Sequence, residues 1–129
     1  MKPTKAMEEY YDLSTTVDEQ REKWHGHGKE ICQIAVPQAL VCFFEGENFE
    51  DVIRNCISIG GDSDTIAAIA GGIAEAYFGV PEDFQKKVRR YVSPKLLSVS
   101  DAFDAWLEAK TGRDKIAAQI QNAEKKFCE

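Results

Sequence analysis

Two aspartates stand two positions apart immediately before an apolar segment of the chain. Residues 60–65 read Gly-Gly-Asp-Ser-Asp-Thr, and most of residues 66–78 are apolar. Carboxylates this close together repel each other and lose hydration next to an apolar segment, unless a cation, a proton or solvent intervenes. The junction formed by residues 60–65 is therefore a candidate site.

The chemistry of this junction depends on whether it is helical. In one continuous helix, Asp62 and Asp64 would point about 200° apart, whereas in a loop that enters a helix they can converge. Carboxylate and hydroxyl oxygens suit Mg²⁺, Mn²⁺ or Ca²⁺ better than zinc. Gly60 and Gly61 permit positive φ and a close approach of a ligand to the backbone, and the first N–H groups of a helix favour an anion.

A simpler interpretation stays open on spacing alone. Either Asp62 or Asp64 is a plain helix N-cap, with the other carboxylate in water, which is a common use of aspartate at such a place. An EF-hand is disfavoured, because the sequence that follows is an apolar helix without the required glycine and glutamate. A helix cap and a metal or phosphate site are therefore the two alternatives.

The elements that must position this junction are predicted to be helical. The chain has 129 residues and 43% hydrophobic residues, which suits one folded domain over residues 1–129. No stretch shows the two-residue alternation of a strand, so the fold class is all-α. Helices are expected over residues 17–24, from Pro37 to 44, from 49 onward, over 64–78, from Pro81, from Pro94 to 111, and as a terminal helix within 113–129.

Several of these helices carry specific signals. Asn48 is expected to cap the helix that starts at residue 49, which is the clearest amphipathic segment. The segment 64–78 is apolar on nearly all sides and predicts a central helix, with a break at Gly71-Gly72 as the alternative. In the helix that starts at Pro94, four residues share one apolar face: Leu96, Val99, Phe103 and Trp106.

Charge and cysteine content narrow the class of protein. The formal charge of −6 argues against a general nucleic-acid binder. No apolar stretch reaches the roughly 20 residues of a membrane span, and no signal peptide is evident, so we expect a soluble, cytoplasmic protein. The four cysteines are expected to be reduced thiols: Cys32, Cys42, Cys56 and Cys128.

Other chemistry-bearing residues give weaker signals. His25 and His27, with Cys32 nearby, offer a soft-metal cluster, but their spacing matches no tetrahedral zinc pattern, and a solvated histidine pair is more typical. No GxSxG motif supports a nucleophilic serine.

A longer set of segments resembles a known family. These segments are residues 11–14, 36–40, 49–55, 57–71 and 74–79. Together they resemble the C-terminal part of the ADP-ribosylglycohydrolase family, and the similarity covers about residues 10–105.

The resemblance implies an all-helical orthogonal bundle of six to seven helices and a dinuclear Mg²⁺ or Mn²⁺ centre. In that family the centre binds ADP-ribose and hydrolyses its bond to a protein side chain or a small acceptor. The family motif maps its metal ligands onto Asp62, Asp64 and Thr65, with Gly60, Gly61 and Ser63 lining the same loop toward the substrate.

The chain also departs from the family pattern. Family members are longer, and their N-terminal half carries a second acidic pair that completes the metal centre, whereas this chain has no Asp-Asp pair. We therefore expect weak metal binding and assign no catalytic residue. Three interpretations stay open: a fragment, a split enzyme completed by a partner chain, and a non-catalytic helical interaction module whose exposed helices a partner chain or a homo-oligomer covers.

Overall fold

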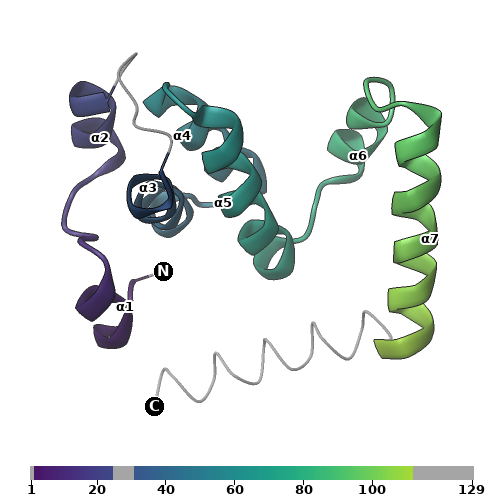
Figure 1. Ribbon diagram of the computed structural model, residues 1–129, viewed down its shortest axis with the longest axis horizontal. Coiled ribbons are helices and arrows are strands. Elements are labelled where there is room, and N and C mark those ends of the chain that lie inside the picture. Colours follow the sequence, from purple (N-terminus) through teal and green to yellow (C-terminus); the bar gives the residue numbers. More distant parts are fainter. Residues whose placement is uncertain (1, 25–30, 112–129) are drawn as a thin grey trace. The chain divides into compact units, whose positions relative to one another are not determined.

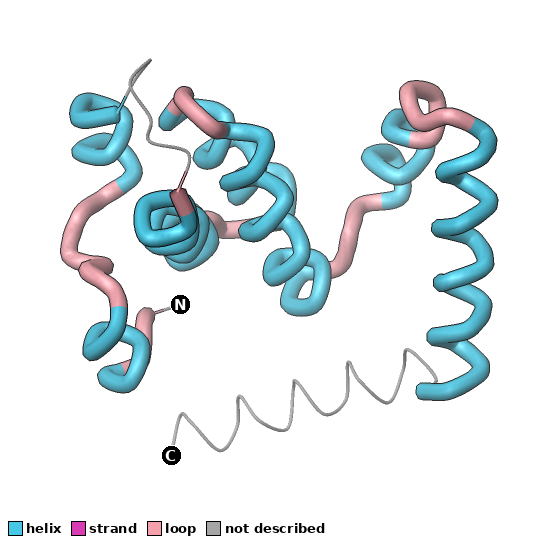
Figure 2. The backbone as a smooth tube through the Cα atoms, in the orientation of Figure 1, coloured by secondary structure: helices cyan, strands magenta, loops and turns pink. Residues whose placement is uncertain are grey.

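The computed structural model describes residues 2–24 and 31–111, and the regular elements in these ranges are all helices (Figures 1 and 2). The all-α prediction is confirmed. The expected terminal helix in 113–129, the two histidines and Cys128 lie outside the described residues. The helices are α1 (Lys5–Tyr10), α2 (Val17–Trp24), α3 (Cys32–Glu45), α4 (Phe49–Ile59), α5 (Ser63–Phe78), α6 (Glu82–Val88) and α7 (Pro94–Thr111).

The chain divides into two compact units, residues 1–79 and residues 80–129. Every residue that is buried in the described part of the chain belongs to the first unit. The expectation of one domain over residues 1–129 stays a prediction.

The core of the first unit forms where α3, α4 and α5 meet, and α2 packs against α3 and α4. Ala39 and Cys42 of α3 are fully buried, as are Val52 and Cys56 of α4 and Ala70 of α5. Small side chains at these contacts allow the helix backbones to approach closely.

The buried thiols act as small apolar side chains. Cys42 and Cys56 are both free and buried, whereas Cys32 is free and exposed. A hydrogen bond to Cys56, together with burial, raises the pKa of Cys42, so that this thiol stays protonated. This agrees with the expectation of reduced thiols in the core.

Helix α3 begins earlier than predicted. The prediction placed its start near Pro37, but it begins at Cys32 and Pro37 lies inside it. A proline in this position removes one backbone hydrogen bond. The helical turn before Pro37 is held by other hydrogen bonds, because the Ile31 carbonyl accepts from the N–H groups of Ile34 and Ala35, at 3.0 Å each. Burial of Ala35 adds to this anchoring.

Side chains cap the starts of α2 and α4, and the cap of α4 by Asn48 was predicted. In α2, Thr16 Oγ1 accepts from the Glu19 N–H at 3.2 Å, and the Thr16 N–H donates to Glu19 Oε2 at 2.7 Å. The Thr16 N–H and the Thr16 hydroxyl both donate to Glu19 Oε2, and these two hydrogen bonds lower the pKa of Glu19. In α4, Asn48 Oδ1 accepts from the Asp51 N–H at 3.0 Å.

Helix α5 runs without interruption from Ser63 to Phe78, so the alternative of a break at Gly71-Gly72 is wrong. A Cβ atom on Gly71 would lie 3.2 Å from Ile53 Cδ1, which shows how closely α4 approaches at this point. The helix is less enclosed than its apolar sequence predicts. Its buried side chains lie on one face (Ile66, Ala70 and Ala74), whereas Ala68, Gly72 and Ala76 are exposed.

The second unit contains α6 and α7. Pro81 takes the N-cap position of α6, and Pro94 is the first residue of α7, as predicted. The Arg89 guanidinium contacts the Asp101 carboxylate at 2.8 Å and lowers the pKa of that carboxyl. The four residues of the expected apolar face of α7 are all more than half exposed: Leu96, Val99, Phe103 and Trp106.

Alanine substitutions at two glycines of the first unit should change stability in opposite directions. A Cβ atom on Gly46 would overlap Val52 Cγ2, so Gly46→Ala should lower the free energy of unfolding by about 1–3 kcal/mol. Gly72 has nothing within 4 Å of its Cβ position, so Gly72→Ala should raise it by about 0.5–1 kcal/mol through helix propensity. Urea unfolding of both variants checks this, and an equal effect of the two substitutions would contradict the packing at Gly46.

Candidate functional site

The candidate junction is a short turn between two packed helices. Helix α4 ends at Ile59, and Gly60 and Gly61 follow with φ values of 78° and 61°. Such positive φ values are readily adopted by glycine and are costly for other residues. The Gly60 N–H donates to the Ile57 carbonyl at 3.2 Å, which closes the end of α4. The two glycines therefore reverse the chain direction within a few residues.

Buried side chains hold both sides of this turn. Ile59, the last residue of α4, is fully buried, and Ile66, in the first turn and a half of α5, is 1% exposed. Burial of one such side chain is worth about 1.5–3 kcal/mol. The loop between them is thus fixed at both ends, although its own side chains are half-buried or exposed.

Asp62 takes the N-cap position of α5 but does not act as a cap. Its carbonyl accepts from the Ile66 N–H at 3.0 Å, but its carboxylate makes no capping hydrogen bond. The plain-cap interpretation is therefore not realised at Asp62. In the same structure, Thr16 and Asn48 do cap their helices through their side chains.

The six predicted site residues lie together on this turn and on the first turn of α5. Asp62 and Ser63 are half-buried, and Asp64 and Thr65 are exposed. Asp64 in the first turn of α5 interacts favourably with the positive end of the helix dipole. Among the residues that the structure describes, no three His, Cys, Asp or Glu side chains gather closely enough to hold a metal ion. The junction contributes two carboxylates.

One residue that positions this turn was not predicted. Arg21 of α2 donates from Nη2 to Ser58 Oγ at 2.8 Å and from Nε to the Ser58 carbonyl at 3.3 Å. Its Nη1 also contacts Asp18 Oδ1 at 2.7 Å. The guanidinium thus ties α2 to the last turn of α4, directly before Gly60. The sequence signals only the Asp18–Arg21 pair, because Ser58 lies 37 positions away.

Comparison with known proteins assigns the family. The chain matches the model of the ADP-ribosylglycohydrolase family over residues 2–124. The chain belongs to the ADP-ribosylglycohydrolase family. The match includes the whole junction of residues 60–65, so the resemblance predicted from the sequence is confirmed.

Curated relatives of this ADP-ribosylglycohydrolase family member include the ADP-ribosylhydrolase ARH3 of Homo sapiens, at 35% identity over 80 residues, and that of Bos taurus, at 38% over 80 residues. Each match covers 51% of this chain and 22% of the relative. An uncharacterised protein of Archaeoglobus fulgidus is 44% identical over 48 residues, which is 36% of this chain and 16% of that protein. No solved structure matches significantly.

The matched region therefore spans about a fifth of the length of the ARH3 relatives. Within the described ranges of this family member, no helix is both long enough and apolar enough to cross a membrane.

The Arg21 tether predicts a local effect on the junction. In Arg21→Met the aliphatic stem is kept and the donors to Ser58 are lost, so we expect a loss of about 1 kcal/mol in the free energy of unfolding. We also expect faster amide hydrogen exchange at Gly60 and Gly61. Asp18→Ala removes only the exposed ion pair and should change neither quantity measurably. Unchanged exchange at Gly60 in Arg21→Met would show that the tether does not hold the turn.

Proposed function

We propose that this chain forms part of an ADP-ribosylglycohydrolase site in which Asp62, Asp64 and Thr65 are oxygen ligands of Mg²⁺ or Mn²⁺. The observation that carries the proposal is the Asp62 carboxylate, which takes the N-cap position of α5 without making a capping hydrogen bond. An aspartate that forgoes a cap, worth about 0.5–2 kcal/mol elsewhere, leaves its oxygens available to a ligand. Family membership and the adjacent Asp64 support the same assignment.

The turn has the chemistry that an ADP-ribosyl substrate requires. A dication at the two carboxylates supplies positive charge that offsets the repulsion of a diphosphate and orients ribose hydroxyls. Gly60 and Gly61 allow a ligand to approach the backbone closely, and Ser63 adds a hydroxyl at the helix start. Free N–H groups in the first turn of α5 add further donors to a bound anion.

The ligand set of this chain is a partial one. A hard dication prefers about six oxygen ligands, and Asp62, Asp64 and Thr65 supply three side chains. We therefore propose that the remaining ligands of a dinuclear centre, and the groups that act at the scissile bond, come from a partner chain or from a second copy. We also propose a cytoplasmic location, which agrees with the free thiols Cys42 and Cys56.

Metal binding tests the ligand assignment. Mn²⁺ titrated into the protein should broaden the amide resonances of residues 60–66 first, because these lie at the ligands. The double variant Asp62→Asn/Asp64→Asn should weaken this binding at least about tenfold, since both anionic ligands are lost.

A matched control removes the same charge from another helix start. Glu82 and Asp83 lie in the first turn of α6, and Glu82→Gln/Asp83→Asn should leave the Mn²⁺ affinity at residues 60–66 unchanged. Equal Mn²⁺ affinity of the wild-type protein and Asp62→Asn/Asp64→Asn would refute the assignment.

Hydrolysis by the chain alone tests whether the site is complete. We expect the purified 129-residue protein to release little or no ADP-ribose from an ADP-ribosylated peptide in the presence of Mg²⁺, because half of the metal ligands are missing. A full-length family enzyme serves as the positive control. Robust Mg²⁺-dependent turnover by the purified chain would overturn the proposal of a partial site.

A second candidate function is a non-catalytic helical interaction module. The four apolar residues along α7 that are more than half exposed favour it: Leu96, Val99, Phe103 and Trp106. Phe103 and Trp106 stack with their ring centres 5.8 Å apart, which gives this face a continuous aromatic surface. Sedimentation decides between a self-associating protein and a monomer, and a monomer at all concentrations without dye-accessible apolar surface would count against this function.

A further inference from the structure

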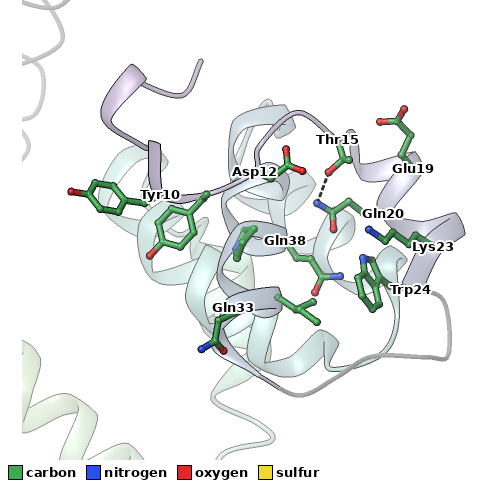
Figure 3. Close-up of a pocket in the computed structure, with 12 residues that line it drawn as sticks. Tyr10, Asp12, Thr15, Glu19, Gln20, Lys23, Trp24, Gln33 and Gln38 are labelled. Carbon is green, nitrogen blue, oxygen red and sulfur yellow. Dashed lines mark hydrogen bonds between the residues drawn. The ribbon is translucent and has the colours of Figure 1, made fainter. Parts of the chain in front are cut away.

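A cavity of about 260 Å³ lies between α2 and α3, within the first unit (Figure 3). This volume approaches the lower end of small-molecule sites, which span roughly 300–1,000 Å³. All of its lining residues fall between residues 10 and 38, so it contains none of the residues of the junction at 60–65.

The deepest polar groups of the cavity are two glutamine amides. Gln20 and Gln38 line it and are each only 5% exposed. The Gln20 Nε2 donates to Thr15 Oγ1 at 2.9 Å, which orients that amide (Figure 3). The Gln38 amide makes no hydrogen bond to any residue of the described ranges. It also keeps some access to solvent. Its donor and acceptor are therefore open to the cavity that it lines.

A polar group this buried points to a ligand. The Gln38 amide has a donor and an acceptor that no protein group uses, and a hydrogen bond made to such a group is worth about 0.5–1.5 kcal/mol. A ligand with a matching donor and acceptor can form both bonds in place of solvent.

The side wall of the cavity is aromatic. Trp24, which is half-buried, lies beside Gln38, and Tyr11 also lines the space. The Lys23 ammonium lies 5.1 Å from the centre of the Trp24 ring. Both residues line the cavity, and Lys23 is exposed, so its flexible stem can move aside and leave the indole face to a planar ligand.

The mouth of the cavity carries mixed charge with an excess of negative charge. The charged residues of the lining are Asp12, Glu19 and Lys23. Hydrogen bonds from Ser14, together with the nearby Lys23, lower the pKa of Asp12, so this carboxylate is ionised at neutral pH. A phosphate would meet two carboxylates against one ammonium here, whereas the hydroxyls of a neutral ligand can donate to Asp12.

We propose that this cavity binds a purine nucleoside, with the edge of the base on the amides of Gln20 and Gln38 and its face against Trp24. A glutamine amide pairs bidentately with the N6 and N7 groups of adenine, so adenosine is the nucleoside whose edge fits best. The ribose hydroxyls lie toward Asp12 at the mouth. This site is separate from the metal junction and does not depend on the function proposed for it.

Adenosine titrated into the whole protein and followed by NMR tests the proposal. We expect saturable shifts of the Trp24 indole N–H and of the Gln38 side-chain amide, and AMP should bind several-fold more weakly than adenosine. Gln38→Leu should weaken adenosine binding at least about tenfold, because the bidentate contact is lost. Gln85→Leu, the same change on α6, should leave the affinity unchanged.

Two further variants separate binding from folding. Asp12→Asn changes an exposed side chain and keeps the oxygen that accepts from Ser14. Because it removes one carboxylate from the mouth, the affinities for adenosine and AMP should become more similar. Asp62→Asn/Asp64→Asn should bind adenosine as the wild type does, whatever its Mn²⁺ affinity. No saturable shift with adenosine, tighter binding of AMP, or wild-type affinity in a folded Gln38→Leu would each overturn the proposal.

Discussion

Helices α4 and α5 pack against each other on either side of a two-glycine turn, and the first unit is organised around this contact. Ile59 before the turn and Ile66 after it are buried, so the backbone of the loop is fixed from both ends by the core. Positive φ at Gly60 and Gly61 allows the chain to reverse within this short distance. Packing on both sides of the turn therefore sets the positions of Asp62 and Asp64.

The electrostatics of this turn differ from those of the other helix starts. The side-chain oxygens of Thr16 and Asn48 accept hydrogen bonds from backbone N–H groups, and each such cap is worth about 1 kcal/mol. Asp62 occupies the equivalent position and makes no such bond. Asp64, two positions further along the chain, gains from the helix dipole while staying exposed. The Asp62 carboxylate therefore has no backbone partner, and Asp64 adds a second carboxylate in the first turn of the same helix.

Local rules predicted the parts of the fold that depend on neighbouring residues. Asn48 and Thr16 were predictable as caps because each acts on an N–H group three positions away. The start of α3 was not, because the turn before Pro37 is held by the Ile31 carbonyl and by burial of Ala35, and neither is signalled by a local helix-start pattern. The exposed face of α5 was also missed, since an apolar helix does not reveal which of its sides is covered.

The candidate site was likewise predictable only where it depends on neighbouring residues. The positions of the junction residues followed from their spacing, but the tether that holds the turn did not. Arg21 reaches Ser58 across 37 positions, and no local pattern encodes that contact. The separate cavity was missed for the same reason, because Gln20 of α2 and Gln38 of α3 line one space only after the helices pack. Tertiary contacts of polar side chains leave no periodic trace in a sequence, in contrast to apolar faces.

The ligand set that we propose has a physical consequence for any complete centre. Asp62 is half-buried and Asp64 is exposed, so both carboxylates keep hydration that weakens their mutual repulsion. Further carboxylates brought to the same place would add repulsion and desolvation, which only a bound dication offsets. Assembly with a chain that supplies those ligands should therefore depend on the metal, whereas the fold of the first unit should not. Metal would then act as the link between the two sets of ligands, and its affinity would rise as they come together.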